Sequence, residues 1–152
     1  MDNFPRLNLP PLVAPRLRRD GDMVRIYDVC RNAYVKLTPE EWVRQHFVGY
    51  LGGVLGYPAT IIGNEVSLRL NGLSRRADTV VYDEHGEPYI IVEYKAPHVE
   101  ITQHVFDQIV RYNMVLRARY LAVSNGLRHY CCAIDYDAMS YKFIPQLPSY
   151  GG

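Results

Sequence analysis

The 152-residue sequence has few cysteines, no long apolar run and almost no net charge. Its three cysteines, Cys30 and the adjacent Cys131 and Cys132, match no zinc-ligand spacing, so we expect reduced thiols, with the adjacent pair on opposite faces of a strand. Charge interrupts every apolar run well before the roughly 20 residues that a membrane-spanning helix needs. Because 17 basic residues face 16 acidic ones, a local basic patch would have to hold any polyanionic partner.

The composition is that of one packed domain, with 48% hydrophobic and 22% charged residues. Met1 to Pro15 contains four prolines and no apolar signal core, so we expect a cytoplasmic protein with no membrane partner. Residues 1–22 are proline-rich and basic, which predicts an extended arm lying on the domain or on a partner. Residues 23–152 are then expected to form a single domain.

The order of predicted elements indicates the α/β class. We expect a hairpin over residues 23–37 and a helix that Thr38 caps and that runs to about Leu55. After it we predict strands over 61–70, 78–82 and 89–93, a helix over 99–116 capped by Thr102, a strand over 120–124 and a hairpin of 129–134 with 141–144. The prediction is a central mixed sheet flanked by helices, with extra hairpins. An apolar stripe on the first helix should face its core: Val43, Phe47, Tyr50, Leu51 and Val54.

Charged residues at the ends of two predicted strands suggest a catalytic site. Glu93 and Lys95 are two residues apart and therefore lie on one face of a strand that is otherwise apolar. If Asp78 lies beside Glu93 on the adjoining strand, the two carboxylates could hold Mg²⁺, and Lys95 could polarise or deprotonate a metal-bound water. The alternative is a salt bridge at the rim of the sheet, in which Asp78 or Glu93 pairs with Lys95 or Arg76.

A third carboxylate follows from a register argument. A hairpin centred between Gly72 and Leu73 would put Asp78 opposite Ser67, so Glu65 would lie on the same face, one step along. Glu65 is therefore a candidate metal ligand. Glu41 on the first helix competes for this role, but its place in a capping box already explains it.

These residues carry a resemblance to a known superfamily. Asp78, fourteen intervening residues and Glu93-Tyr94-Lys95, set on this order of elements, resemble the PD-(D/E)XK nucleases, which have the restriction-endonuclease-like fold. Gln108-Ile109-Val110-Arg111-Tyr112 is similar to the Gln-x-x-x-Tyr motif of the RecB-like branch, which includes the N-terminal nuclease domain of type I restriction enzyme R subunits. The resemblance covers residues 34–126.

The resemblance implies a Mg²⁺-dependent DNA endonuclease, with Mn²⁺ as a substitute metal. It implies that Asp78 and Glu93 bind the metal and that Lys95 assists the attacking water. Gln108 and Tyr112 are one helical turn apart, so they share a face and could reach a phosphate or the carboxylates; the alternative is that Tyr112 belongs to the core.

The same resemblance implies DNA and other restriction-modification subunits as partners. The sequence contains no Gly-x-x-x-x-Gly-Lys-Ser/Thr loop, so an ATP-driven motor would have to act in trans. The alternative functions are a non-catalytic module that binds nucleic acid or protein on the same fold, and a metal-dependent hydrolase of small molecules.

Overall fold

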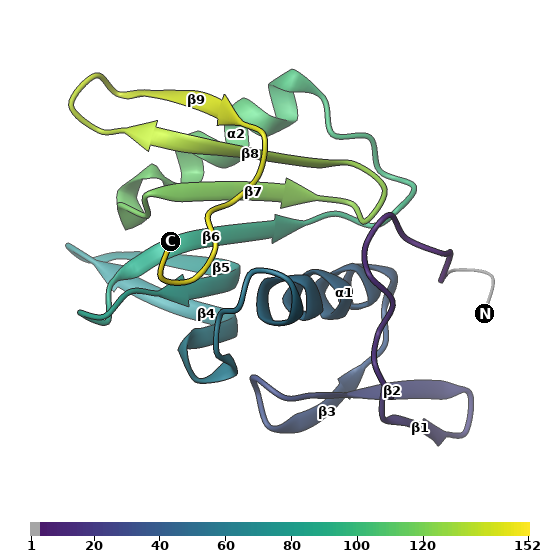
Figure 1. Cartoon of the computed structure of the whole chain (residues 1–152). Coiled ribbons are helices and arrows are strands. Elements are labelled where there is room, and N and C mark those ends of the chain that lie inside the picture. The colour runs from purple at the N-terminus through teal and green to yellow at the C-terminus, as the bar shows by residue number, and fades with distance from the viewer. Residues whose placement is uncertain (1–3) are drawn as a thin grey trace.

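The chain forms a six-stranded mixed sheet between two helices, with a separate three-stranded antiparallel sheet beside the first helix (Figure 1). The structure, a computed structural model, describes residues 4–152. The predicted α/β class with a central mixed sheet, flanking helices and extra hairpins is confirmed. Within the described residues we find no helix with the length and apolar character of a membrane-crossing segment.

The elements follow the predicted order with shifted ends. They are β1 (Leu17–Asp20), β2 (Met23–Asp28), β3 (Ala33–Lys36), α1 (Pro39–Gly53), η1 (Ala59–Ile61), β4 (Ile62–Leu70), β5 (Leu73–Tyr82), β6 (Pro88–Tyr94), α2 (Gln103–Asn113), η2 (Met114–Leu116), β7 (Tyr120–Ser124), β8 (His129–Asp135) and β9 (Ser140–Ile144). The large sheet has the order β4-β5-β6-β7-β8-β9, in which β6 and β7 are parallel and the other pairs antiparallel. Two boundaries differ most: β5 begins five residues earlier than expected, and α2 begins four residues later.

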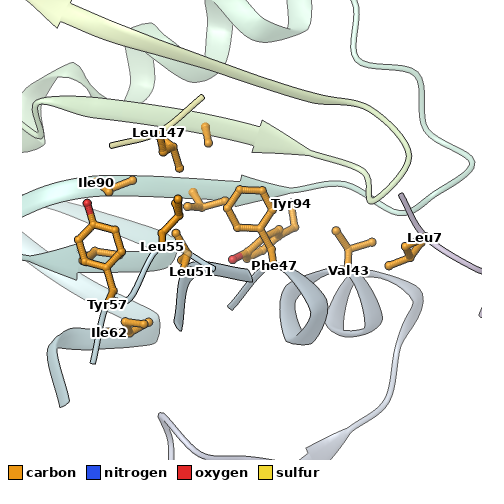
Figure 2. Close-up of a cluster of buried hydrophobic side chains, with 13 residues drawn as sticks. Leu7, Val43, Phe47, Leu51, Leu55, Tyr57, Ile62, Ile90, Tyr94 and Leu147 are labelled. Carbon is orange, nitrogen blue, oxygen red and sulfur yellow. The ribbon is translucent and has the colours of Figure 1, made fainter. Parts of the chain in front are cut away.

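Helix α1 covers one face of the large sheet. Thr38 caps it as predicted, because its hydroxyl accepts a hydrogen bond of 3.0 Å from the Glu41 amide. Val43, Phe47 and Leu51 are buried against β5 and β6 (Figure 2). Val54, which we predicted on the same stripe, is 59% exposed, because the helix ends at Gly53.

Helix α2 covers the opposite face. Thr102 caps it by accepting a hydrogen bond from the Val105 amide, as predicted. Its buried residues Phe106 and Val110 pack in a second core with residues of β5 to β8. Cys132 lies in this core and Cys131 packs against the first, so the expectation that they face opposite sides of a strand is confirmed.

The backbone of β4 is irregular at Glu65, and this changes which face its side chains meet. Glu65 has a φ of 54°, in the left-handed region that non-glycine residues rarely adopt. The pairing with β5 keeps the same register before and after Glu65, so no residue is inserted. Before it, Ile62 packs in the α1 core; after it, Val66 and Leu68 pack in the α2 core, although regular alternation would put all three on one face.

The segment before β1 lies on the domain, which is one of the two locations that we predicted for the arm. Leu7 is buried in the α1 core, and the Asn8 amide donates a hydrogen bond of 2.8 Å to the Gly126 carbonyl. Gly126 has a φ of 86°, and a Cβ there would lie 2.7 Å from the Leu7 side chain, so this close approach requires glycine. Residues 17–20, which we expected within the arm, instead form β1 and pair with β2.

We predict that Leu7→Ala lowers the free energy of unfolding by about 2 to 3 kcal/mol, because it removes apolar contacts inside the core. The control is Val13→Ala, since Val13 belongs to the same segment but is 94% exposed. Thermal denaturation of the two variants measures the difference. Equal melting temperatures would mean that this segment does not contribute to the core.

Candidate active site

The five predicted catalytic residues line one cleft of about 460 Å³, beside the end of β6. The sheet contributes Asp78, Glu93 and Lys95, and α2 contributes Gln108 and Tyr112. The other residues that line the cleft are Glu40, Arg76, Tyr94, Ile109 and Asn113. Residues from four separate parts of the chain therefore meet at this position.

Asp78 and Glu93 lie side by side. Strands β5 and β6 pair Thr79 with Val92, and continuing this antiparallel register by one residue brings Asp78 opposite Glu93. The Tyr94 amide donates a hydrogen bond of 2.8 Å to Asp78 Oδ2, which fixes that carboxylate at the strand end. The proximity that the sequence suggested for the two carboxylates is therefore present in the structure.

Glu93 is held in an environment that disfavours its charge. Burial raises the pKa of Glu93 well above its ordinary range, the nearby charge of Asp78 raises it further, and the Asn113 amide only partly offsets them. Glu93 Oε1 is buried with no hydrogen-bond partner. Neither Asp78 nor Glu93 forms an ion pair within residues 4–152, so the alternative of a rim salt bridge is wrong.

The carboxylate pair has the chemistry of a small divalent-cation site. Its unpartnered buried oxygen and the mutual repulsion of two carboxylates are both relieved by a bound cation. Within the described chain, no group of three or more His, Cys, Asp or Glu side chains is arranged to hold a metal. Mg²⁺ commonly binds through one or two carboxylates and completes its coordination with water or substrate phosphate, so two carboxylates fit it.

Lys95 continues β6 past its last assigned residue. Its amide donates a hydrogen bond of 2.9 Å to the Ser124 carbonyl of β7, which extends the ladder between these parallel strands. Ile91 of β6 packs in the α2 core, so alternation puts Glu93 and Lys95 on this same face. Lys95 forms no ion pair with a described residue and is half-buried in the cleft.

Gln108 and Tyr112 are exposed on the cleft side of α2. Tyr112 is 46% exposed, which argues against the alternative that it belongs to the core. The Arg75 guanidinium lies 4.7 Å from the centre of the Tyr112 ring and donates a hydrogen bond of 3.3 Å to the Tyr112 carbonyl. Arg75 therefore holds this tyrosine from the β5 side.

The predicted register of Glu65 was wrong by two residues. The turn is centred between Asn71 and Gly72, so Ser67 pairs with Arg76, and Asp78 falls opposite Glu65. Glu65 accepts hydrogen bonds from Arg44 at 2.5 Å and from Arg76 at 2.8 Å. Burial alone would raise the pKa of Glu65, but the hydrogen bonds and charges of the two arginines outweigh it and lower the pKa. Both Glu65 oxygens are thus already engaged by cations.

Glu41 is engaged in the same way. It accepts hydrogen bonds from Arg31 at 2.7 Å and from Arg44 at 3.2 Å, and its amide closes the helix cap. The helix residue that lines the cleft is its neighbour Glu40. Glu40 was not predicted at the cleft. The capping-box position identified only its neighbour Glu41, and successive helix residues face different directions.

One other cleft residue was missed, and one lies in the cleft with a different partner from the one we considered. Arg76, named as a possible salt-bridge partner of Asp78 or Glu93, lines the cleft but pairs with Glu65. Asn113 directly follows Tyr112, is buried, and leaves its Oδ1 without a partner while its Nδ2 donates to the Ile109 carbonyl. An amide next to the Gln-x-x-x-Tyr pattern was the available signal for it.

Comparisons with known proteins identify similar chains. The family described as "Type I restriction enzyme R protein N terminus" matches residues 39–148. A solved structure of a fragment described as an HsdR subunit of a type I restriction enzyme from Vibrio vulnificus YJ016 has a similar fold, with a TM-score of 0.51 and 18% sequence identity. The match covers 74% of this chain and 24% of that one, so this chain spans about a quarter of that structure's length. No curated protein matches the sequence.

The raised pKa of Glu93 predicts a pH-dependent stability. Because the pKa is higher in the folded chain than its ordinary value of 4.5, the folded chain keeps a proton that the unfolded chain releases. The metal-free protein should therefore lose stability as the pH rises above that value, and Glu93→Gln should remove this loss. Thermal denaturation in EDTA from acidic to alkaline pH measures it.

The control for this prediction is Glu100→Gln, which changes an exposed carboxylate outside the cleft. It should follow the pH dependence of the unmodified chain. If the stability gained by Glu93→Gln does not grow with pH, then the environment assigned to Glu93 is incorrect.

Proposed function

The chain belongs to the family of type I restriction enzyme R protein N termini, and from this premise we propose that it cleaves DNA phosphodiester bonds as a Mg²⁺-dependent endonuclease. The observation that carries the proposal is the pair of adjacent carboxylates, Asp78 and Glu93, with a buried oxygen that lacks a partner and with Lys95 on the same face. A structural role for this pair would leave an unfavourable charge arrangement uncompensated.

Asp78 and Glu93 are the residues that would hold the metal. Bound Mg²⁺ would supply a water of lowered pKa and would neutralise charge on the phosphate. We leave Glu65 out of the proposed ligand set, because Arg44 and Arg76 already engage its oxygens. The carboxylates that remain at the site are those of Asp78, Glu93 and the nearby Glu40, all of which line the cleft.

Lys95 acts on the water and on the phosphate. Its ammonium group can donate hydrogen bonds but not accept them, so it orients and polarises the attacking water and stabilises negative charge as the phosphorus–oxygen bond forms. Its position on the face of Glu93 keeps it close to the carboxylates without neutralising either of them.

Gln108 and Tyr112 position the phosphate from the α2 side. The amide of Gln108 and the hydroxyl of Tyr112 are exposed in the cleft and can each donate a hydrogen bond to a phosphate oxygen. The stacked Arg75 restricts the tyrosine ring, so less freedom is lost when the hydroxyl binds.

The partners proposed for this nuclease are DNA and other subunits of a restriction-modification complex. A motor acting in trans would bring the DNA. The alternative function is a module of the same fold that binds nucleic acid or protein without cutting. A module released from catalysis is free to lose any of its three charged residues, whereas Asp78, Glu93 and Lys95 are all present and adjoin one cleft.

Cleavage of plasmid DNA with Mg²⁺ or Mn²⁺ tests the function. We expect Lys95→Ala to lower the rate by at least about 100-fold without lowering the melting temperature, because a half-exposed lysine contributes to chemistry more than to the core. Lys142→Ala is the matched control, since Lys142 is exposed on β9, away from the cleft. Full metal-dependent cleavage by Lys95→Ala would overturn the mechanism, and no cleavage by the unmodified chain would favour the binding module.

Calorimetric titration with Mn²⁺ separates metal binding from cleavage. The unmodified chain and Lys95→Ala should both bind the metal. The double variant Asp78→Ala/Glu93→Ala should not, because it removes both proposed ligands and no group of three or more His, Cys, Asp or Glu among the described residues is arranged to replace them. Unchanged binding by the double variant would place the metal elsewhere.

A separate prediction concerns Tyr112. Tyr112→Phe keeps the ring under Arg75 and removes only the hydroxyl, so we expect a cleavage rate about 10-fold lower and an unchanged melting temperature. Tyr130→Phe, at a tyrosine 39% exposed on β8, is the control. A Tyr112→Phe protein that melts earlier but cuts normally would assign Tyr112 a purely structural role.

A further inference from the structure

The three-stranded sheet is buried on one face only, and there only at β2. Strand alternation puts Ile26 and Asp28 of β2 on the face toward α1, where they are 2% and 1% exposed. The opposite face, which we call the outer face, consists of Arg16, Arg18, Asp20, Met23, Arg25, Tyr27, Tyr34 and Lys36. Figure 1 shows that the sheet lies on the far side of α1 from the large sheet, so neither helix covers this outer face.

Positive charge is concentrated on the outer face. It carries four cations and one carboxylate, a net charge of +3 in a chain whose total is +1. Asp20 pairs with Arg18 at 3.5 Å and with Arg25 at 3.1 Å. Arg16 and Lys36 form no ion pair within residues 4–152.

The cations form a row that is unfavourable without a partner. The register pairs Arg18 with Arg25 and Arg25 with Lys36, so three cations lie directly opposite one another across three strands. Like charges in cross-strand pairs destabilise a sheet, and a single carboxylate relieves them only in part. Since neighbouring strands are about 4.8 Å apart, the row extends over about 10 Å, a length over which a nucleic-acid backbone presents several phosphates.

The neighbouring cross-strand pair, Tyr27 and Tyr34, orients two arginines for binding. The Arg16 guanidinium lies 3.8 Å from the centre of the Tyr27 ring, and that of Arg18 lies 5.9 Å from the Tyr34 ring. The two tyrosines pack edge to face at 5.2 Å. Stacking fixes the plane of a guanidinium and leaves its N–H groups free for phosphate oxygens.

A chain of ion pairs connects this sheet to the cleft. Arg31 bridges Asp28 of β2 to Glu41 of α1, at 2.5 and 2.7 Å, and Arg44 then bridges Glu41 to Glu65 of β4, at 3.2 and 2.5 Å. The outer face is thus fixed relative to the catalytic residues. Lys36 also lies only four positions before Glu40, which lines the cleft.

We infer that the outer face binds the phosphate backbone of duplex DNA. The cleft itself offers a polyanion little net attraction, because its two cations are matched by carboxylates and Arg76 is already paired with Glu65. A basic surface outside the cleft is therefore needed to hold the DNA. The choice of DNA as the polyanion rests on the proposed function; the charge, stacking and register that form the surface do not.

Fluorescence anisotropy with a labelled DNA duplex in EDTA tests this inference without cleavage. We expect Arg18→Glu/Lys36→Glu to weaken binding by at least about 10-fold and to lower the dependence of log Kd on log salt by about 2, because two phosphate contacts are lost. Arg119→Glu/Lys142→Glu is the matched control. Both residues are exposed and lie outside the three-stranded sheet and the cleft, and the change in net charge is the same.

Each outcome decides one question. If the charge-reversed pair binds as tightly as the control, or if the unmodified chain does not bind the duplex, the inference is overturned. If poly-glutamate displaces the duplex at equal charge concentration, the face recognises acidic polypeptide and not DNA. Arg18→Gln/Lys36→Gln provides the same test should charge reversal lower the melting temperature.

Cleavage by the same proteins separates this inference from the proposed function. Binding without cleavage by the unmodified chain contradicts the nuclease proposal and leaves the DNA surface standing. Cleavage by the unmodified chain together with full binding by Arg18→Glu/Lys36→Glu contradicts the DNA surface alone.

Discussion

Asp78 and Glu93 are held side by side at the end of buried strands. Their carboxyl groups repel each other when both are ionised, and the rest of the fold must offset this cost. The residues just before Glu93 are fully buried between two helices, so the strand cannot shift to expose it. The Tyr94 amide then holds Asp78 in place. The two cores thus fix an arrangement that the carboxylates alone would avoid.

The distribution of arginines keeps the pair acidic. The left-handed backbone at Glu65 brings that carboxylate to Arg44 and Arg76, so both cations are engaged by β4, with β5 between this strand and Glu93. Had Arg76 paired with Asp78 instead, the site would be close to neutral and would attract a divalent cation less strongly. A local change of backbone direction therefore decides where charge is neutralised and where it remains.

Local signals predicted the fold better than the register. Thr38 and Thr102 could be identified as helix caps because capping depends on a few neighbouring residues. The position of Glu65 relative to Asp78 depended on the centre of a turn, and its orientation depended on a left-handed backbone at a non-glycine residue; no single residue type specifies either of them. Strand β1 was missed for a related reason: its four residues are all exposed, so no burial pattern marks it after the proline-rich segment.

The charge of the cleft also bears on the order in which its partners bind. The raised pKa of Glu93 keeps this residue protonated near neutral pH in the metal-free chain, so the cleft then carries two charged carboxylates and two cations. With a divalent cation bound and Glu93 ionised, its net charge would be +1. DNA held on the outer face would therefore meet a neutral cleft before metal binds and an attractive one afterwards. Because the chain of arginines and carboxylates fixes that face relative to the cleft, the backbone can stay in place while the charge of the cleft changes. Affinity and chemistry are then supplied by separate groups, so the carboxylates need not be weakened as metal ligands in order to admit the phosphate.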